Sequence, residues 1–246
     1  MSNRFINKVA IVTGGVSGIG EAIVRRLSAE SGRVVIFDFD QAGLDRLSAE
    51  PQVNSLNIDV SKEEAVIQGI QAVVDQFGRL DILVHSAGIV GPTGTKITDY
   101  RTEDFQRVLQ TNLFSAYFLT KHAIPHMIKN NYGRILLISS MAGKDGNPGM
   151  VGYSTSKAGI IGLVKAIGKE YAETGITVNG LAPAVIRTPM NEKTSAEQLR
   201  YLTERIPMRR LGTVAEAASL ACWIVSEEAS FNTGFIFDLS GGRATY

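Results

Sequence analysis

Tyr153 and Lys157 lie four positions apart in the segment GYSTSKAG, residues 152–159. In an α-helix, side chains at positions i and i+4 project from the same face, so the Lys157 ammonium can lie beside the Tyr153 phenol. A free phenol has a pKa of about 10, and a base that works near neutral pH needs a pKa roughly three units lower. A nearby cation favours the phenolate, so this spacing is typical of an activated tyrosine base, although an ordinary exposed helix turn has the same pattern.

A second pattern, TGGVSGIG at residues 13–20, follows an apolar run and precedes a helix-like segment. Its glycines Gly14, Gly18 and Gly20 let a backbone approach a pyrophosphate, and a helix N-terminus supplies amide donors. Asp38 ends the next apolar run, 24 positions after Gly14, close to the spacing of about 20 for the carboxylate that binds the ribose 2′-hydroxyl of NAD. A 2′-phosphate is repelled there, and no Arg or Lys stands in the turn or directly after Asp38. The sequence therefore predicts NAD rather than NADP.

The whole chain alternates short apolar runs with longer amphipathic segments. The apolar runs predict seven β-strands, at residues 8–13, 33–38, 53–58, 80–85, 133–139, 175–181 and 234–239. Helix-like segments lie near residues 18–30, 41–49, 61–77, 101–129, 154–172 and 213–226. This alternation is typical of an α/β fold with a doubly wound parallel sheet and helices on both faces. We expect a single domain over residues 1–246, in which the polar segment around 188–212 forms a substrate lid.

The composition argues against several classes of protein. The 246 residues carry 25 Lys and Arg against 24 Asp and Glu, and a formal charge of +1 provides no field that attracts nucleic acid or an anionic membrane. The single cysteine, Cys222, cannot form an internal disulfide, and its apolar neighbours predict a buried thiol. The sequence has no apolar run of about 18 residues and no signal-peptide core at its N-terminus. We expect a cytoplasmic protein with no nucleic-acid or membrane partner.

Five ordered motifs together resemble the short-chain dehydrogenase/reductase family. They are TGGVSGIG at 13–20, HSAG at 85–88, Asn112, Ser140 and YSTSK at 153–157. The resemblance extends from Lys8 to about Gly242 and implies a Rossmann-like fold of seven parallel strands that binds a nicotinamide cofactor. It also implies a catalytic set of four residues, Asn112, Ser140, Tyr153 and Lys157.

The resemblance also implies where the cofactor lies. The residues expected to bind NAD are Gly14, Ser17, Gly18, Ile19, Gly20, Asp38, Phe39, Asp59, Val60, Ala87, Gly88, Tyr153, Lys157, Ile186 and Thr188. Among them, Asp59 and Val60 are implied to flank the adenine, and Ile186 and Thr188 to contact the nicotinamide end. We expect no metal, because the two histidines four positions apart, His122 and His126, have no adjacent ligand set in the sequence.

The chemistry of the four catalytic candidates fits oxidation of a secondary alcohol to a ketone. Tyr153 takes the hydroxyl proton, with Lys157 and the positive nicotinamide ring stabilising its phenolate. Ser140, thirteen residues before Tyr153, can hydrogen-bond the substrate oxygen while NAD accepts hydride from the carbon. Asn112 lies in an apolar helix-like segment, where a lone amide is more often a core polar group. Only the resemblance gives Asn112 a role, as the anchor of a water that relays protons through Lys157.

Two positions depart from the family pattern. The family commonly has Asn-Asn-Ala-Gly where this chain has HSAG, so we expect His85 to be a structural imidazole rather than a catalytic one. The family commonly has Pro-Gly where this chain has Pro183 and Ala184. The added methyl group either reshapes the pocket beside the nicotinamide or tightens the loop.

The substrate is expected to be small, hydroxylated and acidic. The loop 141–150, which follows Ser140, is more polar than the wall of a site for a steroid or a long acyl chain. Two arginines are candidates for a bidentate grip on a carboxylate, although a surface arginine has the same sequence signature. The residues expected to contact substrate are Ser140, Asn147, Met150, Arg187 and Arg243. The ending SGGRATY resembles that of dehydrogenases acting on 2-keto-3-deoxy sugar acids, which implies oxidation at the C4 hydroxyl.

Other functions share parts of this sequence signature. A 3-oxoacyl-thioester (acyl carrier protein) reductase, or another sugar or polyol dehydrogenase, carries the same motifs, but Asp38 argues against a reductase that draws on NADPH. A catalytically idle NAD-binding regulator has no need of Tyr153 and Lys157. A nucleic-acid-binding protein on the same scaffold needs a basic stripe, which a net charge of +1 does not favour.

We also expect a homo-oligomer, in particular a homotetramer. Apolar residues occupy more than one face of the predicted helices at 101–129 and 154–172: Phe114, Tyr117 and Phe118 on one, and Ile160, Ile161 and Val164 on the other. These residues either pack within the subunit or, as the resemblance implies, meet a second copy of the helix pair. The tail GFIFDLSGGRATY is likewise implied to contact a neighbouring subunit.

Overall fold

Seven strands form one sheet in the computed structural model, which describes residues 3–188 and 196–244. The strands are β1 Val9–Thr13, β2 Arg33–Asp38, β3 Val53–Asn57, β4 Ile82–His85, β5 Gly133–Ile138, β6 Ile176–Pro183 and β7 Ile236–Leu239. Each of them lies within one of the predicted strand segments or differs from it by a few residues at its ends. The α/β class predicted from the alternation of segments is confirmed.

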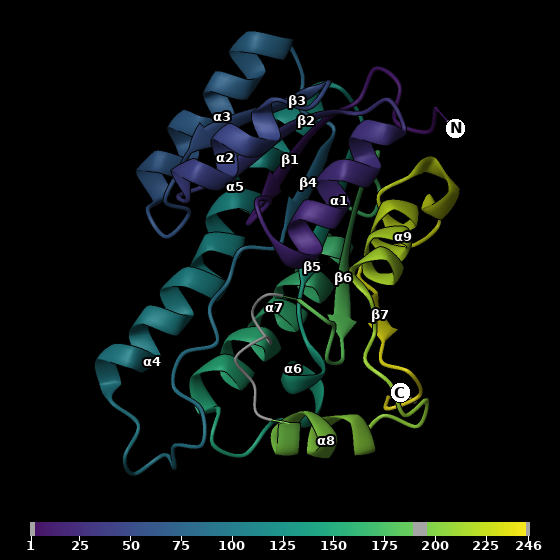
Figure 1. Cartoon of the computed structure of the whole chain (residues 1–246). Coiled ribbons are helices and arrows are strands. Elements are labelled where there is room, and N and C mark those ends of the chain that lie inside the picture. The colour runs from purple at the N-terminus through teal and green to yellow at the C-terminus, as the bar shows by residue number, and fades with distance from the viewer. Residues whose placement is uncertain (1–2, 189–195, 245–246) are drawn as a thin grey trace.

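The strand order is β3-β2-β1-β4-β5-β6-β7, and every neighbouring pair is parallel. The chain builds outward from β1 to β3 and then returns to place β4 on the other side of β1 (Figure 1). The connections after β1 and β4 therefore run in opposite directions. Doubly wound sheets bind their ligands at such a reversal, beyond the carboxyl ends of the strands.

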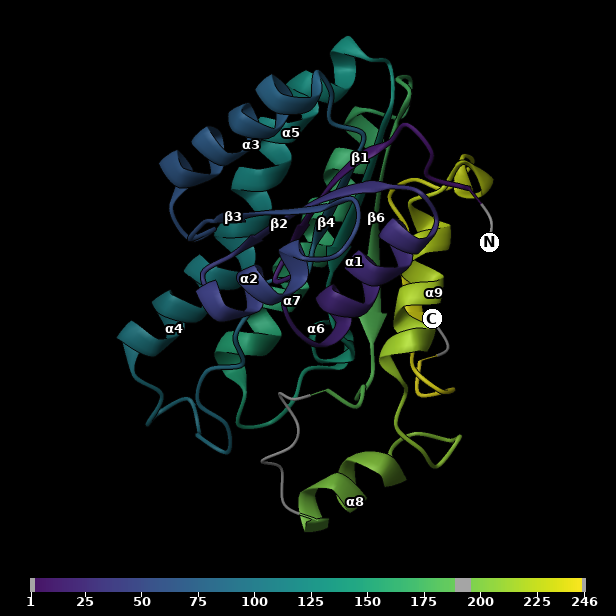
Figure 2. The same ribbon diagram turned by 45° about the horizontal axis from the view of Figure 1, so that its top comes forward.

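Helices cover both faces of the sheet, as Figures 1 and 2 show. One face is covered by α1 (Gly18–Ala29), α2 (Gln41–Ser48) and α9 (Val214–Ile224). The other face is covered by α3 (Glu63–Phe77), α5 (Ser115–Lys129) and α7 (Val151–Glu170). None of the helices among the described residues is both long and apolar enough to cross a membrane.

Two apolar clusters fill the spaces between the sheet and its helices. The central strands β1, β4, β5 and β6 are buried at every position, because a sheet that is covered on both faces exposes neither set of alternating side chains. Cys222 on α9 belongs to the second cluster and is fully buried, as predicted. Its burial raises the pKa of the thiol to about 12.

Three helical features depart from the sequence prediction. The segment predicted as one helix at 101–129 consists of α4 (Thr102–Leu109), a π-helical turn (Gln110–Phe114) and α5. The short helix α6 (Met141–Asp145) and the helix α8 (Ala196–Glu204) had no predicted counterpart. Residues 189–195 of the predicted lid lie outside the part of the chain that the structure describes.

The apolar residues proposed for subunit contacts divide into two groups. Ile160 and Val164 on α7 are fully buried in the core of their own subunit. They therefore pack within the subunit rather than against a second copy of the helix pair. Phe114 and Tyr117 are 45% and 43% exposed, and each ring packs near Phe118, with centroids 6.2 and 5.8 Å from it. The aromatic face before and along α5 therefore remains available to a partner.

Candidate active site

The glycine turn between β1 and α1 leaves no room for side chains. Gly14 and Gly18 have φ angles of 63° and 54°, in the region that favours glycine. A Cβ atom on Gly20 would lie 2.0 Å from the Gly14 carbonyl oxygen, and one on Gly14 would lie 2.8 Å from the Ala87 Cα. Ser17 is the N-cap of α1, yet its exposed side chain makes no capping hydrogen bond. The turn thus presents bare backbone and the N-terminus of α1, which suits a pyrophosphate.

Asp38, at the end of β2, lies beside this turn. Its Oδ1 accepts hydrogen bonds from the Phe39 and Asp40 amides at 2.8 and 3.2 Å, and its Oδ2 accepts a longer one from the Val16 amide at 3.4 Å. A carboxylate has about four acceptor positions, so Oδ2 retains capacity for a hydroxyl donor. Phe39 is 74% exposed at the same edge.

A cation that sequence spacing did not reveal also reaches the turn. Arg46, on α2, donates to the Val16 carbonyl at 2.8 Å. Its guanidinium is bound at the same time by both carboxylate oxygens of Glu21, at 2.9 Å each. The positive charge of Arg46 is therefore compensated within the protein, and the charge argument from Asp38 stands.

Asp59 and Val60 follow β3 at the same edge of the sheet. Asp59 is exposed, and its Oδ1 accepts hydrogen bonds from the amide and hydroxyl of Ser61 at 3.0 and 2.6 Å. Val60 is only 7% exposed and belongs to the core beneath this edge. Asp59 therefore shapes the turn into α3, while Val60 packs into the core below it.

Tyr153 and Lys157 share one face of α7, as their spacing predicted, but the ammonium does not contact the phenol oxygen directly. The Lys157 Nζ atom lies 5.7 Å from the centroid of the Tyr153 ring and donates to the Ile138 carbonyl oxygen at 2.8 Å. Burial lowers the pKa of Lys157 to about 8. Burial also raises the pKa of Tyr153 above its ordinary value, against the opposing effect of a hydrogen bond with Ser140. Burial therefore outweighs the Ser140 hydrogen bond in the free protein, and a lower phenol pKa beside Lys157 and the positive nicotinamide ring stays a prediction for the NAD-bound protein.

Ser140 lies directly beyond β5, as the N-cap of α6. Its Oγ accepts a hydrogen bond from the Ala142 amide at 3.1 Å. This bond fixes the hydroxyl at the carboxyl edge of the sheet, where it also meets the Tyr153 phenol. The structure thus brings together Ser140, Tyr153 and Lys157, three of the four predicted catalytic residues.

Asn112, the fourth, lies in the π-helical turn and is fully buried. Its Oδ1 accepts from the Ile89 amide at 2.8 Å, and its Nδ2 donates to the Ile89 carbonyl at 2.9 Å and to Ser156 Oγ at 3.0 Å. A Cβ atom on Gly88 would lie 3.1 Å from the Asn112 Oδ1 and 3.6 Å from the Lys157 Nζ. Asn112 thus joins the loop after β4 to the catalytic helix and lies close to the ammonium.

His85, at the end of β4, is fully buried and bonded at both ring nitrogens. Its Nδ1 lies 2.8 Å from the Thr13 Oγ1, which already accepts from the Ser86 and Ala87 amides and so donates its proton to the ring. Its Nε2 donates toward Ser115 Oγ at 3.1 Å and the Asn112 carbonyl at 3.3 Å. Burial and the nearby Lys157 charge lower the pKa of His85 to about 3. The ring is a neutral structural bridge, in agreement with the sequence interpretation.

The segment after β6 reaches the glycine turn. Ile186 is buried and forms an isolated bridge with Gly212. The Thr188 Cγ2 atom lies 3.3 Å from the place that a Cβ atom on Gly18 would occupy. Ala184 donates its amide to the Leu239 carbonyl at 2.9 Å, and its methyl group packs against the first apolar cluster.

The residues predicted to contact substrate differ in whether their side chains already have partners within the protein. Arg187 is exposed, and its side chain forms no hydrogen bond or ion pair with any residue that the structure describes. Arg243 is already occupied: its Nε and Nη2 lie 2.9 and 2.8 Å from the Asp145 Oδ2, and Nη2 also lies 3.4 Å from the Asn147 Oδ1. The Asn147 Nδ2 faces the sulfur of Met150 at 3.8 Å.

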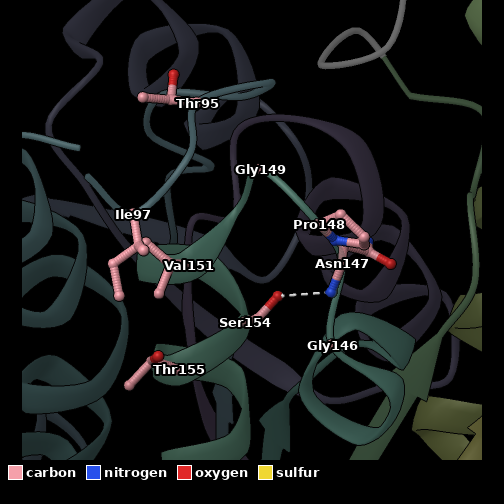
Figure 3. Close-up of a pocket in the computed structure, with 9 residues that line it drawn as sticks. All are labelled: Thr95, Ile97, Gly146, Asn147, Pro148, Gly149, Val151, Ser154 and Thr155. Atoms are coloured by element: carbon pink, nitrogen blue, oxygen red, sulfur yellow. Dashed lines mark hydrogen bonds between the residues drawn. The ribbon is translucent and has the colours of Figure 1, made fainter. Parts of the chain in front are cut away.

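A pocket of about 400 Å³ lies between the start of α7, the loop 146–149 before it and the segment around Thr95 (Figure 3). Thr95 and Ile97 line one side, and Val151, Ser154 and Thr155 of α7 line another. These three positions of α7 share one helix face, whereas Tyr153 and Lys157 share a different one. Tyr153 and Lys157 are not among the residues that line this pocket.

The two histidines of α5 differ in their surroundings. His122 Nε2 lies 2.8 Å from the Glu63 Oε1, and the buried Nδ1 of His126 has no hydrogen-bond partner. Among the described residues, no three His, Cys, Asp or Glu side chains lie close enough together to bind a metal ion.

The parts described above form one connected arrangement at the carboxyl edge of the sheet. A doubly wound parallel sheet with a glycine turn after β1, a carboxylate after β2 and a Tyr, Ser and Lys group beyond β5 is the architecture of dinucleotide-binding oxidoreductases. A family profile described as enoyl-(acyl carrier protein) reductase matches residues 14–244 of the chain. The protein belongs to the short-chain dehydrogenase/reductase family and is an oxidoreductase.

Several characterised relatives match the chain over nearly its whole length. It is 40% identical over 246 residues to a 2-dehydro-3-deoxy-L-rhamnonate dehydrogenase (NAD(+)) of Sphingomonas sp., covering 100% of this chain and 98% of that protein. It is 38% identical over 254 residues to glucose 1-dehydrogenase 2 of Bacillus subtilis (100% and 98%) and 34% identical over 244 residues to a 3-oxoacyl-[acyl-carrier-protein] reductase of Thermotoga maritima (97% and 98%). The crystal structure of gox2181 superposes with a TM-score of 0.93 at 32% identity, covering 98% of this chain and 97% of that one.

The neutral, buried His85 predicts a specific dependence of stability on pH. Its pKa is about 3 in the folded protein and 6.5 as an ordinary histidine, so the unfolded chain binds one more proton between these values. The free energy of unfolding therefore falls as the pH falls below 6.5, by about 2 kcal/mol at pH 5 from this group alone. In the variant His85→Asn this contribution disappears. Urea unfolding of both proteins at several pH values measures it, and parallel pH dependences would contradict the assignment.

Proposed function

We propose that this protein is an NAD-dependent dehydrogenase that oxidises a secondary alcohol of a small hydroxylated acid, in the class of 2-keto-3-deoxy sugar acids, at the C4 hydroxyl. The observation that carries the proposal is the cluster of Ser140, Tyr153 and Lys157 beside a glycine turn that has Asp38 at its edge. A relative that is 40% identical is named for a 2-dehydro-3-deoxy sugar acid and for NAD, which supports both the cofactor and the substrate class.

The residues present fit NAD. The bare backbone at Gly14 and Gly20 accommodates the pyrophosphate, and the N-terminus of α1 supplies its amide donors. The Asp38 carboxylate accepts the ribose 2′-hydroxyl and repels a 2′-phosphate. The remaining residues proposed to contact NAD are Ser17, Gly18, Ile19, Phe39, Asp59, Val60, Ala87, Gly88, Ile186 and Thr188.

The reaction uses the hydroxyl groups that the structure places together. When bound, NAD accepts hydride from the carbinol carbon. Tyr153 removes the hydroxyl proton of the substrate, and the Ser140 hydroxyl, which bonds the phenol in the free protein, then donates to the forming carbonyl oxygen. Ser140 is suited to this task because its N-cap bond to Ala142 holds the oxygen in place.

The proton leaves through Lys157. Its pKa of about 8 lies closer to neutral pH than that of an ordinary lysine, so the side chain can pass a proton on without a large cost. The ammonium lies near Asn112 across Gly88, and Asn112 is held by Ile89 and Ser156. Asn112 is the proposed anchor of the water that carries the proton outward.

Arg187 is the proposed partner of the substrate carboxylate. It is exposed, stands next to Thr188 at the nicotinamide end, and has no partner among the described side chains. A guanidinium binds a carboxylate through two parallel hydrogen bonds, which favours an acid over a neutral polyol. Asn147, which lines the pocket before α7, and Met150 are also proposed to contact the substrate.

A 3-oxoacyl-thioester reductase is the alternative within the same family. Relatives with that name are 34–36% identical over nearly the whole chain. Asp38 argues against it, because its charge opposes the 2′-phosphate of the NADPH that such reductases use.

The proposal also includes the oligomeric state, the cellular compartment and the metabolic role of the protein. A homotetramer is supported by the exposed rings of Phe114 and Tyr117, since apolar surface of this kind is usually covered by a partner. A cytoplasmic role in carbohydrate metabolism is supported by relatives named for sugar and sugar-acid oxidation.

The substrate class is tested by a comparison of three kinds of alcohol with both cofactors. We expect kcat/KM with NAD to be at least about tenfold higher for a 2-keto-3-deoxy sugar acid than for a neutral polyol, because the polyol lacks the charged partner of Arg187. The variant Arg187→Ala should erase that preference, with Arg209→Ala as the control. Faster turnover of a 3-hydroxyacyl thioester with NADP would instead establish the alternative.

The Tyr153–Lys157 pair predicts opposite pH dependences for the two directions of reaction. Alcohol oxidation needs the deprotonated pair and so should rise with pH through one apparent pKa, while ketone reduction should fall through it. In Lys157→Gln the oxidation limb should move to higher pH, because the buried phenol has lost its neighbouring cation. Initial rates from about pH 6 to pH 10 measure both limbs. Tyr153→Phe serves as the inactive control that still binds NAD, and an unmoved limb in Lys157→Gln would refute the pairing.

Asp38 predicts the cofactor preference. In Asp38→Ala we expect the affinity for NAD to fall about 10- to 100-fold, because a hydrogen bond to a charged group is lost. The ratio of the affinities for NAD and NADP should fall by at least as much. Asp38→Asn retains an acceptor without the charge, so it separates hydrogen bonding from repulsion of the 2′-phosphate. Asp40→Ala is the matched control from the same loop. Dissociation constants measured by fluorescence give the answer, and an unchanged NAD to NADP ratio in Asp38→Ala would show that the ribose is read elsewhere.

A further inference from the structure

The short helix α6 is fixed to the catalytic helix on one side. A Cβ atom on Gly143 would lie 2.6 Å from the carbonyl carbon of Lys157, so the two backbones are in direct contact there. The Ser139 hydroxyl donates to the Lys157 carbonyl at 2.8 Å. The start of α6, with Ser140 as its N-cap, is therefore packed against the same turn of α7 that carries Lys157.

On its other side, α6 is held by two ion pairs to the C-terminal segment. The Lys144 Nζ lies 2.8 Å from the Asp238 Oδ2 in β7. The Arg243 guanidinium lies 2.8 and 2.9 Å from the Asp145 Oδ2 through two nitrogens. All four side chains are largely shielded from water, with exposed fractions of 12% and 21% in the first pair and 8% for Arg243 and 26% for Asp145 in the second.

These two pairs have opposite polarity at consecutive positions. Lys144 meets a carboxylate, and Asp145 meets a guanidinium. A shift of α6 by one residue along the C-terminal segment would place like charges together, which is strongly unfavourable where screening is weak. Since α6 has only five residues and cannot be stable alone, these contacts set its position.

We propose that Arg243 and Asp145 are positioning residues: their ion pair holds α6 so that the Ser140 hydroxyl stays within reach of the Tyr153 phenol. This inference rests on the dehydrogenase function proposed above. It assigns Arg243 a different task from a grip on the substrate carboxylate. The guanidinium is 8% exposed and already bound by a carboxylate of its own chain, so an acidic substrate would have to displace Asp145.

The pair also extends order to the neighbouring loop. The Arg243 Nη2 reaches the Asn147 Oδ1 at 3.4 Å. The backbone of Arg243 is itself fixed, because its amide donates to the Ser240 carbonyl oxygen at 3.2 Å. The C-terminal turn thus acts as a fixed base to which both α6 and the following loop are attached.

The test compares Arg243→Ala, the conservative variant Asp145→Asn, their double mutant, and the charge exchange Asp145→Arg with Arg243→Asp. We expect both single variants to lower kcat about tenfold or more while the dissociation constant of NAD stays unchanged, because Ser140 moves and the glycine turn does not. The double mutant should be no slower than either single variant, and the charge exchange should recover part of the loss. Lys8→Ala removes an ion pair far from α6, between Lys8 and the 68% exposed Glu227, and serves as the control for loss of a surface ion pair.

A measurement without substrate separates this inference from the proposed function. Amide hydrogen exchange over residues 139–146 should accelerate in Arg243→Ala and in Asp145→Asn, while exchange over residues 13–20 and in Lys8→Ala stays at the level of the unaltered protein. Unchanged exchange over 139–146 would overturn the positioning role whatever the protein catalyses. A higher KM for an acidic substrate at unchanged kcat in Arg243→Ala, with Asp145→Asn fully active, would also overturn it and assign Arg243 to the substrate. Accelerated exchange in a protein that turns over no tested alcohol would overturn only the dehydrogenase proposal.

Discussion

A parallel sheet that is covered on both faces confines polar chemistry to its edges. The central strands are buried along their whole length, so a reactive side chain within them would have no access to a ligand. Asp38, His85 and Ser140 each stand at or directly beyond the carboxyl end of a strand. The helices that begin at this same edge add amide donors and the face of α7. The position of the whole candidate site thus follows from where the strands stop.

Within this edge, a chain of hydrogen bonds joins the nucleotide side to the catalytic side. It runs from the amides of the loop after β4 through Thr13 to His85, and on to Ser115 and the Asn112 carbonyl. A buried polar network is stabilising only when every member is satisfied, and here the Thr13 and Ser115 hydroxyls each donate one hydrogen bond and accept at least one. The π-helical turn is what brings the Asn112 carbonyl to the imidazole, since the extra residue in that turn breaks the regular α-helical bonding.

The sequence was sufficient for features that depend on local pattern. The β-branched runs located the strands, and the glycine spacing located the turn at Gly14 to Gly20, because both patterns follow from backbone geometry over a few residues. The i, i+4 spacing correctly placed Tyr153 and Lys157 on one face of a helix. What it did not determine was the environment of that face: burial raises the phenol pKa, and the ammonium is bound by Ile138, which is distant in sequence.

Other features depended on contacts between distant segments. Helix α6 is too short for a periodic signal and is fixed by partners nearly a hundred residues away, such as Asp238. The π-helical turn has no sequence pattern that separates it from the helices on either side. Arg46 approaches the glycine turn only because α2 folds back over it. These features depend on contacts between segments that are distant in sequence, and a local pattern does not reveal such contacts.

The buried thiol of Cys222 has a consequence for the chemistry of the molecule as a whole. It is the only cysteine in the chain, and burial of its side chain between α9 and the sheet raises the pKa of the thiol to about 12, so almost none of it is thiolate at neutral pH. Oxidants and alkylating reagents act on the thiolate of an accessible cysteine. The folded protein is therefore inert toward thiol chemistry. A reaction at the Cys222 thiol therefore reports that the helix layer over this face of the sheet has opened.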